Sequence, residues 1–112
     1  MLKDFGFALK EAQKLQEKIA KVQEKLEELT VKGSSGGGMV EVIANGRQQI
    51  LGIKIEKEVI GSEDKEMLED LIVAAVNQAL KSSQELANEE MSKVTGGLLS
   101  NLPEGFKIPG LG

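Results

Sequence analysis

Residues 39–59, MVEVIANGRQQILGIKIEKEV, decide the fold of this chain. The run begins with β-branched residues, and Asn45-Gly46 near its middle is a strong sequence signal for a β-hairpin. On the return side apolar residues alternate with charged ones, which is typical of a strand with one buried face. Gly52 either marks a bulge there or divides the return into two strands. We therefore expect two or three antiparallel strands with one polar face.

A long helix is predicted before this sheet, over residues 2–31. Apolar residues recur there every three or four positions, and from Leu15 onward the spacing is that of a heptad repeat, which favours packing against another helix. Lys32 followed by Gly33 is typical of a helix that ends in a left-handed cap. The glycine-rich residues 33–38 then indicate a flexible connector, because a phosphate-binding loop would follow a strand and precede a helix.

A second long helix is predicted after the sheet, from an N-cap at Ser62 to about Val94, before Gly96-Gly97. Its apolar residues cover well over half of the helix circumference near the middle, so the helix must be covered on two sides. The sheet can cover one side, and we expect a second copy of the chain to cover the other in a homodimer. The predicted fold class is α+β, with one domain over residues 1–97 and a Pro/Gly-containing tail over residues 98–112.

Composition limits the chemistry that this protein can perform. The 112 residues include neither histidine nor cysteine, which removes the commonest general base, the commonest metal ligand and any disulfide. A Ser-Lys pair is conceivable, but the adjacent Lys81 and Ser82 point about 100° apart on a helix. Acidic residues that begin the second helix could serve a Mg²⁺-dependent hydrolase, yet their place at the positive end of the helix dipole explains them more simply. They are Glu63, Asp64, Glu66, Glu69 and Asp70. We therefore expect no enzyme activity, no catalytic residue and no metal site.

The sequence shows no sign of export or membrane insertion. Its N-terminus lacks the uninterrupted apolar run of a signal peptide. The longest apolar stretch, residues 71–76, is far too short to cross a bilayer. We expect a cytoplasmic protein with no membrane partner.

One face of the first predicted helix is rich in lysine, although the chain carries a net charge of −4. The lysines on this face lie within an arc of roughly 80°, and they are Lys3, Lys10, Lys14, Lys18, Lys21, Lys25 and Lys32. Such a stripe can follow the phosphates of a nucleic acid. It can equally be a solvated face, because six carboxylates accompany it in residues 1–32 and Lys-Glu pairs are common on helices. Since Arg47 is the only arginine and no aromatic residues interleave, any DNA binding should have weak sequence preference.

Several short stretches occur in this chain in an informative order. In the first half they are residues 11–18 (EAQKLQEK), 36–42 (GGGMVEV), Asn45-Gly46 and residues 53–55 (IKI). In the second half they are residues 68–72 (LEDLI), 74–79 (AAVNQA), Met91 and residues 95–97 (TGG). Taken in this order, over nearly the whole length, they resemble the YbaB/EbfC family of bacterial nucleoid-associated DNA-binding proteins.

The resemblance implies an α-β-β-β-α subunit in a tightly associated homodimer, with long helices that project like the arms of tweezers. It also implies duplex DNA as partner, a role in nucleoid organisation and gene regulation, a nucleoid-associated location, and neither catalysis nor a cofactor. The projecting helices contact DNA in this family, so the resemblance transfers DNA binding to the corresponding lysines and one glutamine of this chain. These residues are Lys10, Lys14, Lys18, Lys21, Lys25 and Gln13, with Lys93 of the second helix as a secondary candidate.

Two functions therefore remain open. The first is a dimeric DNA-binding protein without strong sequence specificity, whose lysines contact phosphates. The second is a protein-protein interaction module that uses the heptad face of the first helix, which requires that face to stay partly exposed after dimerisation. Replacing Lys14 and Lys18 with glutamate separates the two functions, because only the first predicts a loss of DNA binding with the dimer intact. The heptad face consists of Leu15, Ile19, Val22, Leu26 and Leu29.

Overall fold

A computed structural model describes residues 2–100 of the chain, with the side chains of residues 5–96. Three strands form one antiparallel sheet in the order β1-β2-β3, with a long helix at each end of the chain. The predicted α+β fold of type α-β-β-β-α is confirmed. In order, the elements are α1 (Leu2–Glu28), β1 (Thr30–Ser35), the 3-10 helix η1 (Gly36–Gly38), β2 (Val40–Asn45), β3 (Ile50–Ile55), α2 (Lys57–Ile60) and α3 (Lys65–Ser100).

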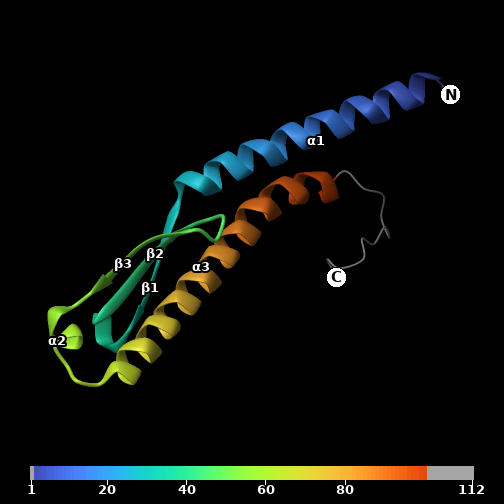
Figure 1. Cartoon of the computed structure of the whole chain (residues 1–112). Coiled ribbons are helices and arrows are strands. Elements are labelled where there is room, and N and C mark those ends of the chain that lie inside the picture. The colour runs from blue at the N-terminus through green and yellow to red at the C-terminus, as the bar shows by residue number, and fades with distance from the viewer. Residues whose placement is uncertain (1, 101–112) are drawn as a thin grey trace.

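The molecule is elongated because α1 projects beyond the sheet (Figure 1). Its radius of gyration is 20.6 Å, whereas a compact domain of about 100 residues has a radius of about 13 Å. Helix α3 packs along β1 and β2 and then continues past the sheet beside α1. The two long helices therefore meet beyond the sheet, near the point where α1 leaves it.

The core lies between the sheet and α3. Small residues let the two layers come close together, because a Cβ added to Gly33 of β1 would collide with the backbone of Ala75 and Ala79 in α3. Alternate residues of a strand point to the same face, and alternate residues of β2 are completely buried under α3. They are Val40, Val42 and Ala44.

Strand β1 corrects the prediction for the end of the first helix. The sequence predicts that helix over residues 2–31, but α1 ends at Glu28, and the expected connector forms β1 and η1 instead. Thr30 and Val31 are β-branched and favour a strand, and β1 pairs with β2 along its whole length. Gly33 is therefore a strand residue rather than a helix cap. Lys32 leaves the lysine face and pairs with Glu41 of β2, with 3.6 Å between Nζ and Oε2.

The predicted hairpin joins β2 to β3, but Asn45-Gly46 does not form a two-residue turn. The loop runs from residue 46 to 49, and the residue with positive φ is Gln48, at 60°. The buried Asn45 side chain organises this loop, since its Oδ1 accepts hydrogen bonds from the backbone N–H groups of Arg47 (2.9 Å) and Gln49 (3.1 Å). The loop is therefore an Asx-type turn rather than the two-residue turn that Asn-Gly sequences commonly form.

The return strand and the second helix also differ in their bounds from the prediction. A register shift opposite Ile43 and Ala44 gives β3 a bulge next to Gly52, so the return is one strand. Asp64, rather than Ser62, caps α3, because its Oδ1 accepts a hydrogen bond from the backbone N–H of Met67 (2.9 Å). Helix α3 continues to Ser100, beyond the end predicted near residue 94. Residues 101–112 of the predicted tail lie outside the described residues, and the domain boundary stays a prediction.

Candidate nucleic-acid interface

The lysine face of α1 is exposed along the projecting helix. Lys14 forms one salt bridge there, at 3.6 Å from Glu11, and both side chains are more than half exposed. A salt bridge of this kind contributes little, so its ammonium group is available to a polyanion. The other DNA-binding residues predicted on α1 are exposed as well, and they are Lys10, Gln13, Lys18, Lys21 and Lys25.

A groove of 350 Å³ separates α1 from α3, and several of these lysines border it. Lys93 of α3 faces them across the groove, so the structure brings the secondary candidate next to the main set. Glu90 is the only carboxylate in its lining, which leaves four ammonium groups against one carboxylate. The complete lining is Lys18, Lys21, Val22, Lys25, Glu90, Lys93 and Val94.

Glu90 is a site residue that the sequence analysis missed. It is only 7% exposed, and it joins the two helices because its Oε2 accepts a hydrogen bond from Lys25 Nζ (2.9 Å) and its Oε1 accepts one from Lys93 Nζ (3.1 Å). Hydrogen bonding from Lys25, and then from Lys93, holds the pKa of the Glu90 carboxyl below its ordinary value. The sequence offered only the i,i+3 spacing to Lys93, which is common on helices.

A buried polar network fixes the base of α1 to the hairpin loop and to α3. Asn45 Nδ2 donates to the backbone carbonyl of Glu27 (3.3 Å), and the Gly46 N–H donates to that of Leu26 (2.8 Å). Ser83 of α3 is fully buried; its Oγ donates to the Asn45 carbonyl (2.7 Å) and accepts from the Gln48 N–H (3.0 Å). These bonds attach three elements to one another at a single point.

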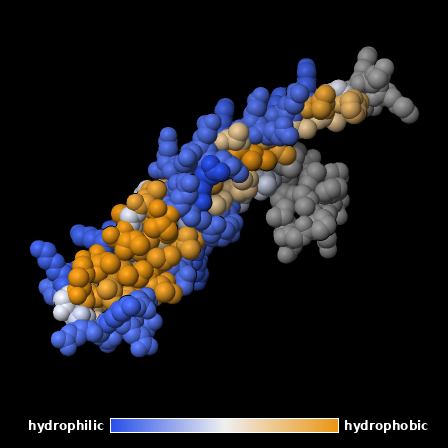
Figure 2. Space-filling model, in the orientation of Figure 1, coloured by the Kyte–Doolittle hydropathy of each residue, from blue (hydrophilic) through white to orange (hydrophobic). Residues whose placement is uncertain are grey.

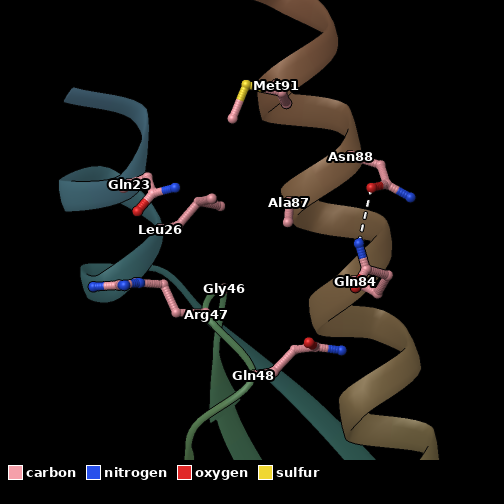
Figure 3. A pocket seen from close by; sticks show the side chains of 9 residues that line it. All are labelled: Gln23, Leu26, Gly46, Arg47, Gln48, Gln84, Ala87, Asn88 and Met91. Atoms are coloured by element: carbon pink, nitrogen blue, oxygen red, sulfur yellow. Dashed lines mark hydrogen bonds between the residues drawn. The ribbon is translucent and has the colours of Figure 1, made fainter. Parts of the chain in front are cut away.

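A second groove, of 320 Å³, lies beside this network (Figure 3). Amide side chains dominate its rim, and one hydrogen bond joins Gln84 Nε2 to Asn88 Oδ1 at 2.9 Å. Arg47 is the only charged residue in the lining. Its Nη1 lies 3.8 Å from Oε2 of Glu27. The groove therefore lacks the concentration of charge found between α1 and α3.

The sheet end of the molecule carries a broad apolar surface (Figure 2). Helix α3 covers β1 and β2, so the apolar side chains of β3 are left uncovered. Ile53 is 47% exposed although it pairs with the buried Val42 and therefore faces the same side as α3. Ile50 is 40% exposed, although it pairs with the buried Ala44 and therefore faces the same side. A contiguous apolar patch of this kind normally marks an interaction surface.

Among residues 5–96, whose side chains are described, no group of three acidic side chains is placed to hold a metal ion. None of the helices described here is both long enough and apolar enough to span a membrane.

The structure has an α-β-β-β-α subunit with a lysine-bearing projecting helix. This is the arrangement that the resemblance to a DNA-binding family implied. The sequence model of the YbaB/EbfC DNA-binding family matches residues 2–98. The chain belongs to this family, as the short ordered stretches predicted, and the family is one of DNA-binding proteins rather than of enzymes.

Several bacterial relatives support this assignment. A nucleoid-associated protein of Syntrophobacter fumaroxidans is 52% identical over 112 residues, covering 99% of each chain. One from Caldanaerobacter subterraneus is 50% identical over 92% of this chain and 86% of its own length, and one from Bacillus cereus is 57% identical over 79% of each. The crystal structure of an uncharacterized protein from Helicobacter pylori has a TM-score of 0.65 at 23% identity, covering 88% of this chain and 97% of its own, and it supports the fold.

Proposed function

We propose that this protein is a homodimeric, nucleoid-associated protein that binds duplex DNA through lysines of its projecting helix, without strong sequence specificity. One observation carries the proposal: an exposed lysine face lies on a helix that extends beyond the core, in a member of a DNA-binding family. The names of the relatives support an association with the nucleoid, and the roles that we propose there are nucleoid organisation and gene regulation. The DNA-contacting residues we propose are Lys10, Lys14, Lys18, Lys21, Lys25, Gln13 and Lys93.

Weak sequence specificity follows from the chemistry of the proposed contacts. Lysine presents a flexible point charge that suits phosphates, whereas base readout in the major groove depends mainly on bidentate side chains such as arginine. Arg47 lies at the base of α1 beside Glu27, away from the lysine face of the arm. Phosphate contact alone requires neither a cofactor nor a catalytic step.

Dimerisation is supported by the uncovered apolar surface of the sheet end. The isoleucines of β3 face the same side as α3, yet α3 packs on the other two strands. A second copy of the chain would cover this surface, and two-fold symmetry would then give the DNA two lysine-bearing arms. Two arms contact more phosphates than one, which offsets the small net charge of each arm.

Fluorescence anisotropy of a labelled duplex, titrated with the full chain across a salt series, tests the proposal. We expect the logarithm of the association constant to fall linearly with the logarithm of salt concentration, with a slope of about −0.9 per phosphate bound. Two unrelated duplexes should give similar affinities. An unshifted duplex at low salt would contradict the proposal.

Reversing the charge of two lysines on the projecting helix α1, the arm of the molecule, tests whether these lysines bind the DNA. Lys14→Glu with Lys18→Glu should abolish measurable DNA binding while the dimer, measured by light scattering, stays intact. The control is Lys54→Glu with Lys57→Glu, which changes the net charge equally at the sheet end. DNA binding that survives the arm variant as well as it survives the control would argue against the lysine face.

A protein-interaction module is the second candidate, and it rests on exposed apolar residues of α1. Phe5 is 71% exposed and Leu9 51%, and the heptad positions Leu15, Ile19 and Val22 are only partly buried, whereas Leu26 is buried. If this face binds a partner protein, the lysine variant should leave that binding unchanged. Leu9→Lys should weaken it while DNA binding is retained.

A further inference from the structure

Two helices from opposite ends of the chain bring four ammonium groups around one groove, although the chain as a whole is acidic. Lys18, Lys21 and Lys25 come from α1, and Lys93 comes from α3. With the single carboxylate of Glu90, the groove has a local charge of +3, against −4 for the chain. The acidic residues of α1 are absent from its lining. Such a concentration of one sign of charge attracts an anion.

The Glu90 carboxylate organises two of the four lysines. Each of its oxygens accepts a hydrogen bond from a different helix, at 2.9 Å from Lys25 Nζ and 3.1 Å from Lys93 Nζ. Two ammonium groups held this close would repel each other without a carboxylate between them. The Glu90 side chain is only 9% exposed, whereas those of Lys25 and Lys93 are 53% and 60% exposed. The carboxylate is therefore the floor of the groove, and the ammonium groups are its accessible surface.

Both ammonium groups keep donors for a ligand. An ammonium group has three N–H donors, and the bond to Glu90 uses one from Lys25 and one from Lys93. Val22 and Val94 contribute the apolar part of the lining of this groove. A tetrahedral anion with several acceptor oxygens matches donors that converge from two helices.

We propose that this groove is a phosphate-binding site in which Lys18, Lys21, Lys25 and Lys93 contact the phosphate. Glu90 is its positioning residue and holds Lys25 and Lys93 in place. Where the phosphate belongs to the DNA backbone, the inference rests on the proposed function and extends the surface that contacts DNA. DNA then touches the junction of α1 and α3 as well as the projecting face of α1. A free polyphosphate presents the same chemistry and is the other possible source of the phosphate.

The first test uses inorganic pyrophosphate as probe and does not depend on DNA. Titrated into the ¹⁵N-labelled full chain, it should shift the amide resonances of residues 18–25 and 90–94 in a saturable manner. Resonances around Lys54 and Lys81, two exposed lysines outside the groove, should move much less. Equal, non-saturating shifts around all lysines would overturn the site.

The second test compares two lysines of the same helix. Lys93→Gln should weaken duplex binding about fivefold, and it should reduce the magnitude of the salt slope by about 0.9 for each phosphate that the variant no longer binds. Lys81→Gln removes the same charge from an exposed position of α3 outside the groove, and it should have less than half of that effect. Equal effects of the two variants would overturn the site.

The third test separates positioning from simple charge. Glu90→Gln and Glu89→Gln each remove one negative charge from neighbouring positions, and only Glu90 bridges two lysines. Charge alone predicts that both variants bind DNA more tightly. Positioning predicts tighter binding for Glu89→Gln but severalfold weaker binding for Glu90→Gln, with unchanged circular dichroism. If Glu90→Gln binds as tightly as Glu89→Gln, the positioning role is refuted.

The outcomes distinguish this inference from the proposed function. Saturable pyrophosphate shifts without any duplex binding would leave the phosphate site standing, with a free polyphosphate as its ligand, and would refute the proposed function. Duplex binding that is indifferent to Lys93 and Glu90, without localised pyrophosphate shifts, would refute the inference and leave the proposed function standing on the lysines of α1, without Lys93 as a contact.

Discussion

The two ends of this molecule are held together by different kinds of contact. At the sheet end, Gly33 lies directly against Ala75 and Ala79, and buried valines of β2 fill the space beneath α3. At the arm end, α1 and α3 are joined by hydrogen-bonded charges around Glu90. The first kind of contact depends on close fit and tolerates almost no added volume. The second depends on charge and responds to salt, pH and other anions.

The contrast separates the part of this chain that we expect to determine stability from the part that we propose to bind DNA. Closely packed layers supply the free energy of folding, while exposed ammonium groups on a projecting helix supply a surface for a polyanion. Changes at the sheet end should therefore act on unfolding and assembly, and changes at the arm end should act on binding. The following predictions test this division, from the largest expected effect to the smallest.

Gly33→Ala should have the largest effect, because the added Cβ collides with backbone atoms of α3 that cannot move aside locally. We expect a loss of about 3 kcal/mol or more in the free energy of unfolding, at or above the upper end of the usual cost of overpacking. Urea denaturation followed by circular dichroism measures it. Gly52→Ala is the matched control, since a Cβ there meets nothing within 4 Å. Similar stability of the two variants would show that α3 does not lie as close to β1 as described.

Ile53→Lys should abolish the dimer with little effect on the folded subunit. The side chain is already 47% exposed in one chain, so the charge remains solvated in the monomer, whereas burial of an unpaired charge in an interface is costly. Light scattering after gel filtration should show the mass of a monomer, and DNA affinity should fall because the arms are separated. Leu9→Lys adds the same charge at a residue 51% exposed on α1. A monomeric Leu9→Lys variant with a dimeric Ile53→Lys variant would place the interface on α1.

Ser83→Ala tests the point at which the two ends meet. It removes the hydroxyl that donates to the Asn45 carbonyl and accepts from the Gln48 N–H, leaving both buried groups without this partner. We expect a loss of about 1–2 kcal/mol in the free energy of unfolding, as for other buried polar groups deprived of a partner. Ser82→Ala, at the neighbouring and less buried position, should cost much less. Thermal or urea unfolding of the two variants gives the comparison, and equal losses would rule out a special role for the Ser83 hydroxyl.

Loss of the Glu90 bridge in Glu90→Gln should have the smallest effect, a change in melting temperature that depends on pH. The folded-state pKa of Glu90 is below its ordinary value of 4.5, so the ionised bridge stabilises the fold above about that pH and this contribution is lost as pH falls through the folded pKa. The wild-type protein should melt at a higher temperature than Glu90→Gln at pH 7. The difference should shrink as the pH is lowered below 4.5. A difference in melting temperature that is independent of pH would assign the effect to packing instead.

Periodicity and turn signals were sufficient to predict the two long helices and the hairpin between them, because these signals depend on neighbouring residues. The heptad spacing in α1 and the alternation in β3 are of this kind. Strand β1 could not be recognised in the same way, since Gly33 and Ser34 resemble a linker until they are seen to lie beside α3 and β2. Asn45-Gly46 correctly predicted a hairpin, but the requirement for Gly46 comes from Leu26, where an added Cβ would lie 2.7 Å from the side chain.

The candidate site likewise contains residues that local sequence patterns predict and one that depends on tertiary contact. The exposed lysines of α1 follow from helical spacing alone, and the structure places all of the described ones at the surface. Glu90 could not be identified in advance, because its main partner, Lys25, is 65 positions away in the sequence. Burial of a carboxylate between two helices is a property of how α1 meets α3, and no local pattern encodes it.

The attachment of α1 at one end also makes this helix a lever. With about 1.5 Å of rise per residue, its 27 residues extend about 40 Å from the fulcrum formed by Leu26, Gly46 and the Asn45 network. A rotation of about 10° at that fulcrum would carry the far end of the helix through about 7 Å. In the proposed dimer, slight repacking around a few side chains would thus change the span between the two arms, and the same core would fit duplexes of different width or curvature.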